Sequence, residues 1–276
     1  MIRSILVALD DTAGAVAARD LALALVRATG ATLSAATVLD WPHVKDANEA
    51  VPPGAAAFKE RRDATRAKRL ETEAEAAFSA CTQAAEQIPF TRLRLTDAPA
   101  PALLAAGATH DVVVIGRDST LGLEQNDEGL APVIEDLLRE GARPLLVVPP
   151  SPAVEGDILV AYDGSVPAMR ALQLFALLGL GDGAAVRVLS VDDKSAEARR
   201  LAEEGAAYLR HHGLAAEAVA VEGSHPLEAL LAEAASMPAR MLVMGAYEHR
   251  GLRALFTGSL TERLLAAAPC PVFVTH

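Results

Sequence analysis

Short apolar runs alternate with longer amphipathic stretches along the whole chain. Unbroken apolar runs lie at 5–9, 112–115, 158–161 and 241–244, which is typical of strands buried on both faces of a parallel sheet. Between such runs, apolar residues recur with helical spacing, most clearly before residues 29 and 178. Strands that alternate with helices predict an α/β fold with parallel sheets and right-handed crossovers.

The same pattern occurs twice. An apolar run ends at Asp10 in the first half and at Asp163 in the second, and a later run ends at Gly116 and again at Gly245. The proline-rich segment 149–152 is a stiff linker between the two copies. We therefore predict two α/β domains, 1–149 and 153–276, each a Rossmann-like five-stranded parallel sheet flanked by helices. The expected strands lie near 5–9, 32–39, 91–95, 112–116 and 144–148, and near 158–162, 185–191, 217–221, 241–245 and 271–275.

The first half carries an insertion of about 24 residues relative to the second. We place it within 41–69, where Pro42, Pro52 and Pro53 indicate a loop that leads into a charge-dense helix. Such an insertion serves either as a lid or partner surface, or as a solvated helical face. The mixed charges favour the solvated face.

Composition and charge narrow the class of protein. The net charge of −11 opposes non-specific binding to nucleic acid or anionic lipid. No stretch reaches the roughly 18 consecutive apolar residues of a membrane span, and the first residues lack a signal-peptide pattern. We expect a cytoplasmic protein without a membrane partner. Cys81 and Cys270 lack metal-type spacing, so no metal site is predicted from them.

The most informative stretch begins at the strand that ends in Gly245. A loop with Arg250 and Arg253 follows, and Gly258-Ser259 then opens a helical segment. Ser259 and Glu262 stand at the spacing of a capping box, so Ser259 is a candidate N-cap. Free N–H groups at a helix start, with basic side chains nearby, form an anion site.

This spacing resembles the nucleotide-binding signature of the universal stress protein family. The signature reads glycine, two residues, glycine, nine residues, glycine, then serine or threonine; Gly245 and Gly258-Ser259 match it, whereas Glu248 replaces the second glycine. The resemblance covers nearly the whole chain as two tandem copies. It implies the strand order 3-2-1-4-5 in each half and an intramolecular pseudo-dimer, with a further homodimer as an option.

The resemblance also implies a set of ligand-binding residues. Asp163 lies near adenine and ribose, while the glycines, Arg250 and Ser259 hold the phosphates of ATP. Taken alone, Asp163 is more simply a residue that caps the following helix; the loop after Gly245 favours the nucleotide role. Glu248 adds bulk and negative charge, which Arg250 or a bridging Mg²⁺ would have to neutralise. The expected binding residues are Asp163, Gly164, Val191, Gly245, Glu248, Arg250, Gly258, Ser259 and Leu260.

The first half differs at the equivalent positions. Leu130 replaces the hydroxyl of Ser259, Asp11 replaces Gly164, and the loop after Gly116 is rich in acids. Phosphate is repelled by such a loop. We interpret this half as a copy that lost the site and that packs against the other half.

Two functions from different classes follow. The leading hypothesis is a universal stress protein that binds an adenine nucleotide, ATP, in its second half and acts in stress response through conformational or partner coupling, with an unidentified protein partner. Occupancy would order the loop 248–257. The alternative is a nucleotide-free interaction protein, for which Glu248 is the argument. Enzyme activity is not expected beyond slow ATP hydrolysis, because no residue is positioned as a general base by sequence alone.

Overall fold

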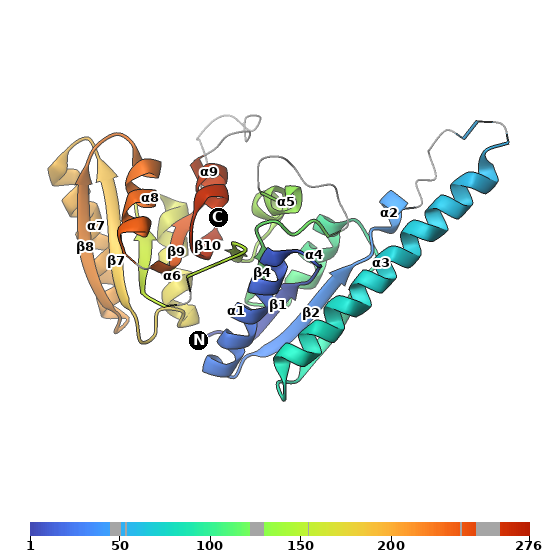
Figure 1. Cartoon of the computed structure of the whole chain (residues 1–276). Coiled ribbons are helices and arrows are strands. Elements are labelled where there is room, and N and C mark those ends of the chain that lie inside the picture. The colour runs from blue at the N-terminus through green and yellow to red at the C-terminus, as the bar shows by residue number, and fades with distance from the viewer. Residues whose placement is uncertain (45–50, 53, 122–129, 154, 238, 247–259) are drawn as a thin grey trace.

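The computed structural model describes residues 1–44, 51–52, 54–121, 130–153, 155–237, 239–246 and 260–276 (Figure 1). The first half consists of β1 (Ser4–Ala8), α1 (Ala13–Thr29), β2 (Thr32–Val38), α2 (Trp41–Val44), α3 (Ala56–Ala85), β3 (Phe90–Leu95), α4 (Pro99–Gly107), β4 (Val112–Gly116), α5 (Pro132–Glu140) and β5 (Leu145–Val148). The second half consists of β6 (Asp157–Ala161), α6 (Val166–Leu178), β7 (Ala185–Asp192), α7 (Ser195–His211), β8 (Ala215–Glu222), α8 (Pro226–Ser236), β9 (Ala239–Gly245), α9 (Leu260–Ala267) and β10 (Val272–Thr275).

Within each half the strands are parallel and follow the predicted order. The first half has the order β3-β2-β1-β4-β5, and the second has β8-β7-β6-β9-β10. The α/β class and the two tandem copies are therefore confirmed. The order changes direction at β1 in one half and at β6 in the other, and each change opens a crevice at the carboxyl ends of the strands.

The two sheets are not separate. Strands β5 and β10 pair antiparallel, with Leu146 opposite Phe273, and this pairing joins both halves into one ten-stranded sheet. The sequence analysis predicted two five-stranded sheets that pack together and did not predict this continuity. Pairing at β5 and β10 satisfies the backbone groups of two strands that would otherwise be exposed sheet edges.

Helices cover both faces of the sheet and bury one apolar cluster on each side. One cluster contains Ala18 of α1, Phe78 of α3, Phe175 of α6 and Leu209 of α7. The other contains residues of α4, α5, α8 and α9, such as Leu264. The central strands β1, β4, β6 and β9 are covered on both faces, so their runs are apolar without alternation, as the sequence predicted. The edge strands β3 and β8 keep exposed and charged residues.

Helix α1 shows how local sequence sets an element. The Thr12 side chain accepts a hydrogen bond from the Ala15 N–H, which satisfies one free donor of the first turn. Gly30 ends the helix in the left-handed conformation, with φ 70°, and its N–H bonds to the Val26 carbonyl. The helix α6 repeats this arrangement, with Ser165 as its N-cap and Gly179 at its end.

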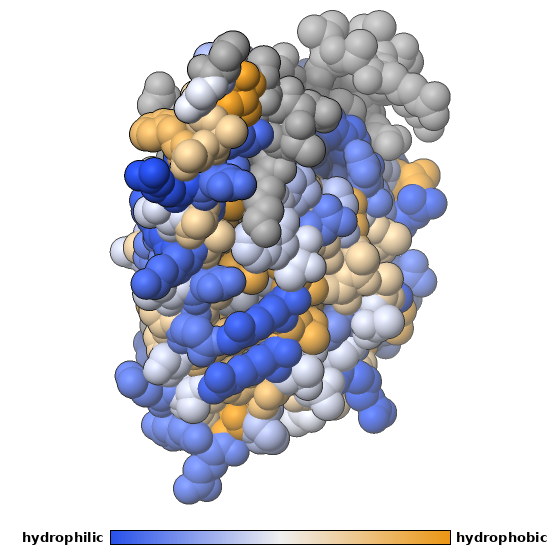
Figure 2. Space-filling model, turned by 90° about the vertical axis from the view of Figure 1, so that its right-hand side faces the viewer, coloured by the Kyte–Doolittle hydropathy of each residue, from blue (hydrophilic) through white to orange (hydrophobic). Residues whose placement is uncertain are grey.

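Helix α3, of 30 residues, begins within the stretch 41–69 where the insertion was placed and continues beyond it. Figure 1 shows α3 extending along one side of the first half and past the end of the sheet. Its buried residues, among them Phe78 and Cys81, belong largely to the later part of the helix, whereas residues 56–73 are largely exposed. Figure 2, which looks onto this side, shows hydrophilic residues running across the face with apolar residues between them.

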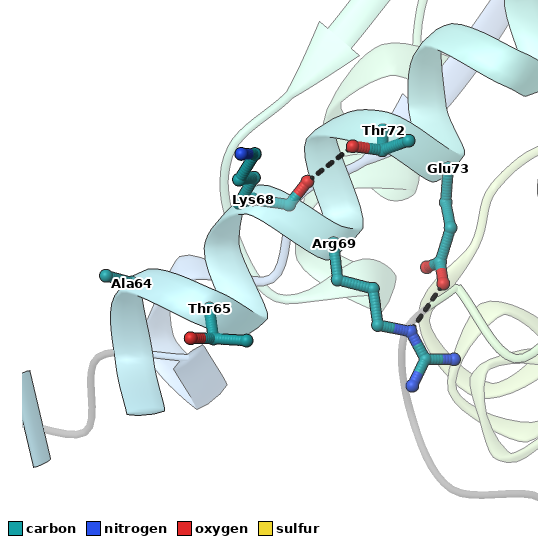
Figure 3. Close-up of a pocket in the computed structure, with 6 residues that line it drawn as sticks. All are labelled: Ala64, Thr65, Lys68, Arg69, Thr72 and Glu73. Atoms are coloured by element: carbon teal, nitrogen blue, oxygen red, sulfur yellow. Dashed lines mark hydrogen bonds and ion pairs between the residues drawn. The ribbon is translucent and has the colours of Figure 1, made fainter. Parts of the chain in front are cut away.

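A shallow hollow lies on the exposed part of α3. The side chains around it come from a single helix, where Arg69 pairs with Glu73 and the Thr72 hydroxyl donates to the Lys68 carbonyl (Figure 3). These are contacts of a helix with itself, and exposed pairs of this kind contribute little to stability. The hollow therefore gives no argument for a ligand site.

Among the residues that the structure describes, no helix is both long and apolar enough to cross a bilayer.

Candidate functional site

A crevice opens in the second half where β6 and β9 end side by side. The strand order reverses between these two strands, which is where open parallel sheets bind ligands. Four of the predicted residues line it together: Asp163, Val191, Gly245 and Leu260. They come from the ends of β6, β7 and β9 and from the start of α9. The fold thus brings together residues that are far apart in the sequence.

The turn between β6 and α6 holds Asp163 at the mouth of the crevice. Its Oδ1 accepts a hydrogen bond from the Ser165 N–H (2.9 Å), and Ser165 in turn caps α6 by accepting from the Ala168 N–H. Gly164 lies between them with φ 73°, a conformation that side chains other than glycine rarely adopt. Asp163 therefore stabilises the turn, and its exposed side chain keeps a second oxygen that accepts no hydrogen bond from the described residues.

Gly245 lies against the first turn of α6. A Cβ atom added at Gly245 would stand 2.3 Å from the carbonyl carbon of Pro167 and 2.4 Å from the Ala168 nitrogen. Both atoms belong to the backbone, so neither yields easily. Glycine is required here for the close approach of strand and helix, whatever its relation to a ligand.

The floor of the crevice is apolar. Most of the floor residues were not assigned from the sequence. Those at or near a strand end or in the first turn of a helix are Ala161, Tyr162, Ala168, Pro226 and Met244, and those inside β7 and α8 are Leu189 and Leu230. Ser165, at the mouth, was not assigned either. The pocket measures about 80 Å³. Polar groups stand at its mouth, at Asp163 and Ser165, and apolar side chains lie beneath them.

Tyr162, at the end of β6, makes hydrogen bonds through both its hydroxyl and its backbone carbonyl. The hydroxyl donates to Glu204 on α7 (2.7 Å), and burial together with this contact raises the tyrosine pKa. The Tyr162 carbonyl accepts a hydrogen bond from the Ser190 hydroxyl (2.5 Å). These bonds tie the end of β6 to α7 and β7, so the strand end that carries Asp163 is held from two sides.

The remaining predicted residues are not among the described lining of the pocket. Gly164 supports the turn and does not line the pocket. Glu248, Arg250, Gly258 and Ser259 fall outside the described residues, and so does the predicted cap of α9. Within the described part of the chain, no group of three or more His, Cys, Asp or Glu residues is arranged to hold a metal ion.

The equivalent crevice of the first half is occupied by its own chain. Asp10 accepts hydrogen bonds at Oδ1 from the N–H and hydroxyl of Thr12, and at Oδ2 from the Leu121 N–H (3.1 Å). Burial raises the pKa of Asp10, although these hydrogen bonds partly oppose the shift. Leu121 has φ 49° and is only 2% exposed, and it is buried in the same apolar cluster as Ala8 and Leu103.

A second contact closes the first crevice. Asp118, which follows β4, accepts a hydrogen bond from the Gly14 N–H at the start of α1 (2.9 Å). A carboxylate is stabilised there by the free N–H groups and the positive end of the helix dipole. An internal carboxylate thus already binds a free N–H group at the start of α1.

Comparison with known proteins decides the family. The model of the universal stress protein family matches residues 1–149 and again residues 156–276. The chain belongs to this family.

A universal stress protein of Synechocystis sp., Slr1230, is 28% identical over 165 residues, which is 59% of this chain and 56% of that protein. This chain therefore spans little more than half of that relative. A universal stress protein of Thermus aquaticus, named for its place in the QAH/OAS sulfhydrylase 3′ region, is 32% identical over 135 residues, or 43% of this chain and 97% of the relative.

Solved structures of the family share the whole fold. A universal stress protein from Archaeoglobus fulgidus superposes with a TM-score of 0.69 at 17% identity, covering 99% of this chain and 97% of the other. A putative universal stress protein from Pseudomonas aeruginosa gives a TM-score of 0.58 at 19% identity and covers 99% and 93%. At such low identity these likenesses show the tandem fold alone.

Proposed function

We propose that this universal stress protein binds an adenine nucleotide, ATP, in the crevice of its second half and relays that occupancy through a conformational change or a protein partner. One observation carries the proposal: Asp163, Val191, Gly245 and Leu260 meet around an apolar pocket at the switch point of the sheet. Supporting it are the family membership and the glycine spacing after β9, which resembles the nucleotide-binding signature of the family.

The chemistry of the pocket suggests how the ligand would lie. About 80 Å³ is well below the roughly 300 Å³ of pockets that enclose a drug-sized molecule, so the pocket receives one part of a nucleotide. Its apolar floor, with Leu189, Leu230 and Met244, suits a base. The free oxygen of Asp163 then accepts a hydrogen bond from a ribose hydroxyl.

The phosphates would extend towards the start of α9. This helix begins at Leu260, on the wall of the pocket, and its first N–H groups and dipole favour an anion. Gly258, Ser259 and Arg250, which precede α9 in the sequence, are the residues that we assign to the phosphates. Mg²⁺ would bridge Glu248 and the phosphates in this scheme.

The alternative function remains an interaction protein without a nucleotide. Its argument is Glu248, a carboxylate at a position where the family signature has glycine. Cytoplasmic location and the identity of a protein partner stay predictions of the sequence. Catalysis is not proposed, because the described lining of the pocket offers a single carboxylate, Asp163, and we assign it to the ribose.

Calorimetric titration of ATP and of adenosine into the purified protein tests the proposal. Asp163→Asn keeps an oxygen for the Ser165 N–H but removes the charge that would bind ribose. Because a hydrogen bond to a charged group contributes about 1.5–3 kcal/mol, both ligands should bind roughly tenfold more weakly or worse. The matched control is Asp192→Asn, because Asp192 makes the same turn contact, to the Lys194 N–H (2.8 Å), on the neighbouring strand.

Two results would decide against ATP binding at this site. If the wild-type protein binds neither ligand at millimolar concentration, the interaction-protein alternative replaces the proposal. If Asp163→Asn and Asp192→Asn behave alike, the ligand lies elsewhere.

A further variant, Gly258→Asp, adds a carboxylate at the expected phosphate position, so it should abolish ATP binding while adenosine still binds.

A further inference from the structure

A side chain of the first half reaches the helix that borders the crevice of the second half. Arg117 follows β4 directly, and its Nη1 donates a hydrogen bond to the Ala268 carbonyl (2.9 Å) across the β5–β10 junction. Ala268 follows the last residue of α9 and is fully buried, and its own N–H bonds to the Leu264 carbonyl (2.8 Å). The contact therefore joins one half to the carboxyl end of α9.

The backbone of Arg117 is fixed on both sides. Its N–H bonds to the Val148 carbonyl at the end of β5, and its carbonyl accepts from the Ala131 N–H, both at 2.8 Å. The next residue, Asp118, is bound to the start of α1. The guanidinium thus projects from a backbone position that is held by hydrogen bonds to β5 and to Ala131.

The hydrogen bond from Arg117 to the Ala268 carbonyl stabilises α9. The last carbonyls of a helix have no partner within the helix and carry its negative partial charge. A guanidinium supplies both a donor and a positive charge at that position. Partial burial lowers the pKa of Arg117, and neighbouring Asp118 opposes the shift, but arginine stays protonated at any physiological pH.

Helix α9 links this contact to the candidate site. It has eight residues, so its two ends lie about 12 Å apart. Leu260 at one end lines the crevice, and Ala268, next to the other end, is held by Arg117. A short helix that packs through Thr261, Leu264 and Leu265 moves as one body, so a contact that fixes its last carbonyl also fixes its first N–H groups.

The residue at the equivalent position of the second half differs. Ala246 occupies the position of Arg117 after β9, and its N–H bonds to the Thr275 carbonyl (2.8 Å) just as that of Arg117 bonds to Val148. The methyl group of Ala246 cannot make the contact that the Arg117 guanidinium makes.

We propose that Arg117 is a positioning residue for the nucleotide site of the second half, acting through helix α9. It holds the carboxyl end of α9 so that the N–H groups at the other end face the phosphates. The inference rests on the proposed function. It gives the first half a specific role that does not require a ligand of its own.

The test compares phosphate-dependent with phosphate-independent binding. In Arg117→Gln the charge and its fixed geometry are lost, so ATP should bind about two- to fivefold more weakly, which corresponds to the usual contribution of a cation at a helix end. Adenosine, which lacks phosphates, should bind as in the wild type. This pattern differs from that of Asp163→Asn, which weakens both ligands.

The chain offers a matched control for the loss of stability. Arg143 donates to the Ala108 carbonyl (2.7 Å), which directly follows α4 in the same way that Ala268 follows α9. Arg143→Gln removes the same kind of contact from a helix of the first half. It should lower thermal stability to a similar extent and leave the affinity for ATP unchanged.

Amide hydrogen exchange supplies the readout for the helix itself. Without ligand, peptides covering α9 should exchange faster in Arg117→Gln than in the wild type or in Arg143→Gln. Arg117→Lys, which keeps the charge and one donor, should restore part of both the exchange protection and the affinity. If Arg117→Gln fails to fold, Arg117→Lys is compared with the wild type instead, and smaller losses of ATP affinity and of exchange protection in α9 are expected.

Several results would overturn the inference. An unchanged ATP affinity in Arg117→Gln would do so, and so would an equal loss for adenosine. Weaker ATP binding without faster exchange in α9 would show that the charge acts at a distance and not through the helix. If the wild-type protein binds no nucleotide, the proposed function fails, which is a different outcome from a wild type that binds and a variant that binds equally well.

Discussion

The crevices of the two halves share a frame and differ in what fills it. In each half an aspartate follows the first strand, a hydroxyl two residues later caps the next helix, and a glycine ends the fourth strand. In the first half these residues are Asp10, Thr12 and Gly116. In the second half they are Asp163, Ser165 and Gly245. The two glycines are both required by close contact with helix backbone, at Ala15 in one half and Ala168 in the other. The frame is therefore set by packing that both copies need.

The described residues of the two crevices differ after the fourth strand. In the first half, Leu121 and Asp118 contact Asp10 and Gly14 directly. In the second half the described residues line a pocket, with an exposed Asp163 at its mouth. A duplicated fold can thus keep its strand ends and helix starts while the residues that follow β4 fill the crevice of one copy.

The largest expected effect comes from emptying the filled crevice. Leu121→Ala removes a fully buried side chain, which typically costs about 2–5 kcal/mol of unfolding free energy. ATP stoichiometry should stay at one per chain, because Asp10 and Asp118 keep their negative charges near the site. Chemical denaturation and calorimetry measure the two quantities.

The control for that variant is Leu177→Ala, because Leu177 lies on the surface of α6 with half of its area exposed. Its truncation should change stability by about 0.5 kcal/mol or less. Equal costs at Leu121 and Leu177 would contradict the view that Leu121 fills the first crevice. A second nucleotide bound by Leu121→Ala would contradict the view that the charges of Asp10 and Asp118 exclude a ligand there.

A smaller effect distinguishes the two helix caps. Ser165→Ala removes the acceptor for the Ala168 N–H and should cost about 1 kcal/mol. Thr12→Ala removes the same kind of cap and also the hydroxyl that donates to Asp10 (2.7 Å), so it should cost about 1 kcal/mol more. Denaturant titration of the single variants measures the difference; identical costs would show that Asp10 does not depend on Thr12.

The smallest effect is the pH dependence contributed by Asp10. Its pKa is raised in the folded state, chiefly by burial, so the folded protein favours the protonated form more than the unfolded chain does. The contribution of this group to stability therefore increases as the pH falls through the folded pKa, and it is complete below the unfolded value of about 3.9. The amplitude is about 1.4 kcal/mol for each unit by which the two pKa values differ.

The measurement compares stability curves of the wild type and Asp10→Asn between neutral pH and the acid range. The wild type should gain stability relative to the variant as the pH falls. A wild type that instead loses stability relative to Asp10→Asn would mean that hydrogen bonds from Thr12 and Leu121 outweigh the burial of the carboxylate, and that the pKa is lowered.

Sequence patterns were sufficient to predict the strand ends and helix starts around the crevices, because these features depend on residues close together in the sequence. The helix ends at Thr29 and Leu178 agree with the periodicity and with the glycines that follow. Asp163, Val191, Gly245 and Leu260 were expected at the site and do line one pocket, because the carboxyl ends of parallel strands share one edge of a sheet. Most of the apolar floor was not predicted, since a buried Leu230 or Met244 reads like any other core residue.

By itself, the sequence determined the α/β class, the two copies and the approximate positions of the strand ends. Hydrophobic periodicity reports which residues are buried, and strand and helix lengths follow from that. Only the tertiary structure decided that β5 pairs with β10, that Leu121 enters the first crevice and that Arg117 reaches α9. These contacts join residues distant in the sequence, and burial alone does not specify which partner a buried strand, side chain or charge will meet.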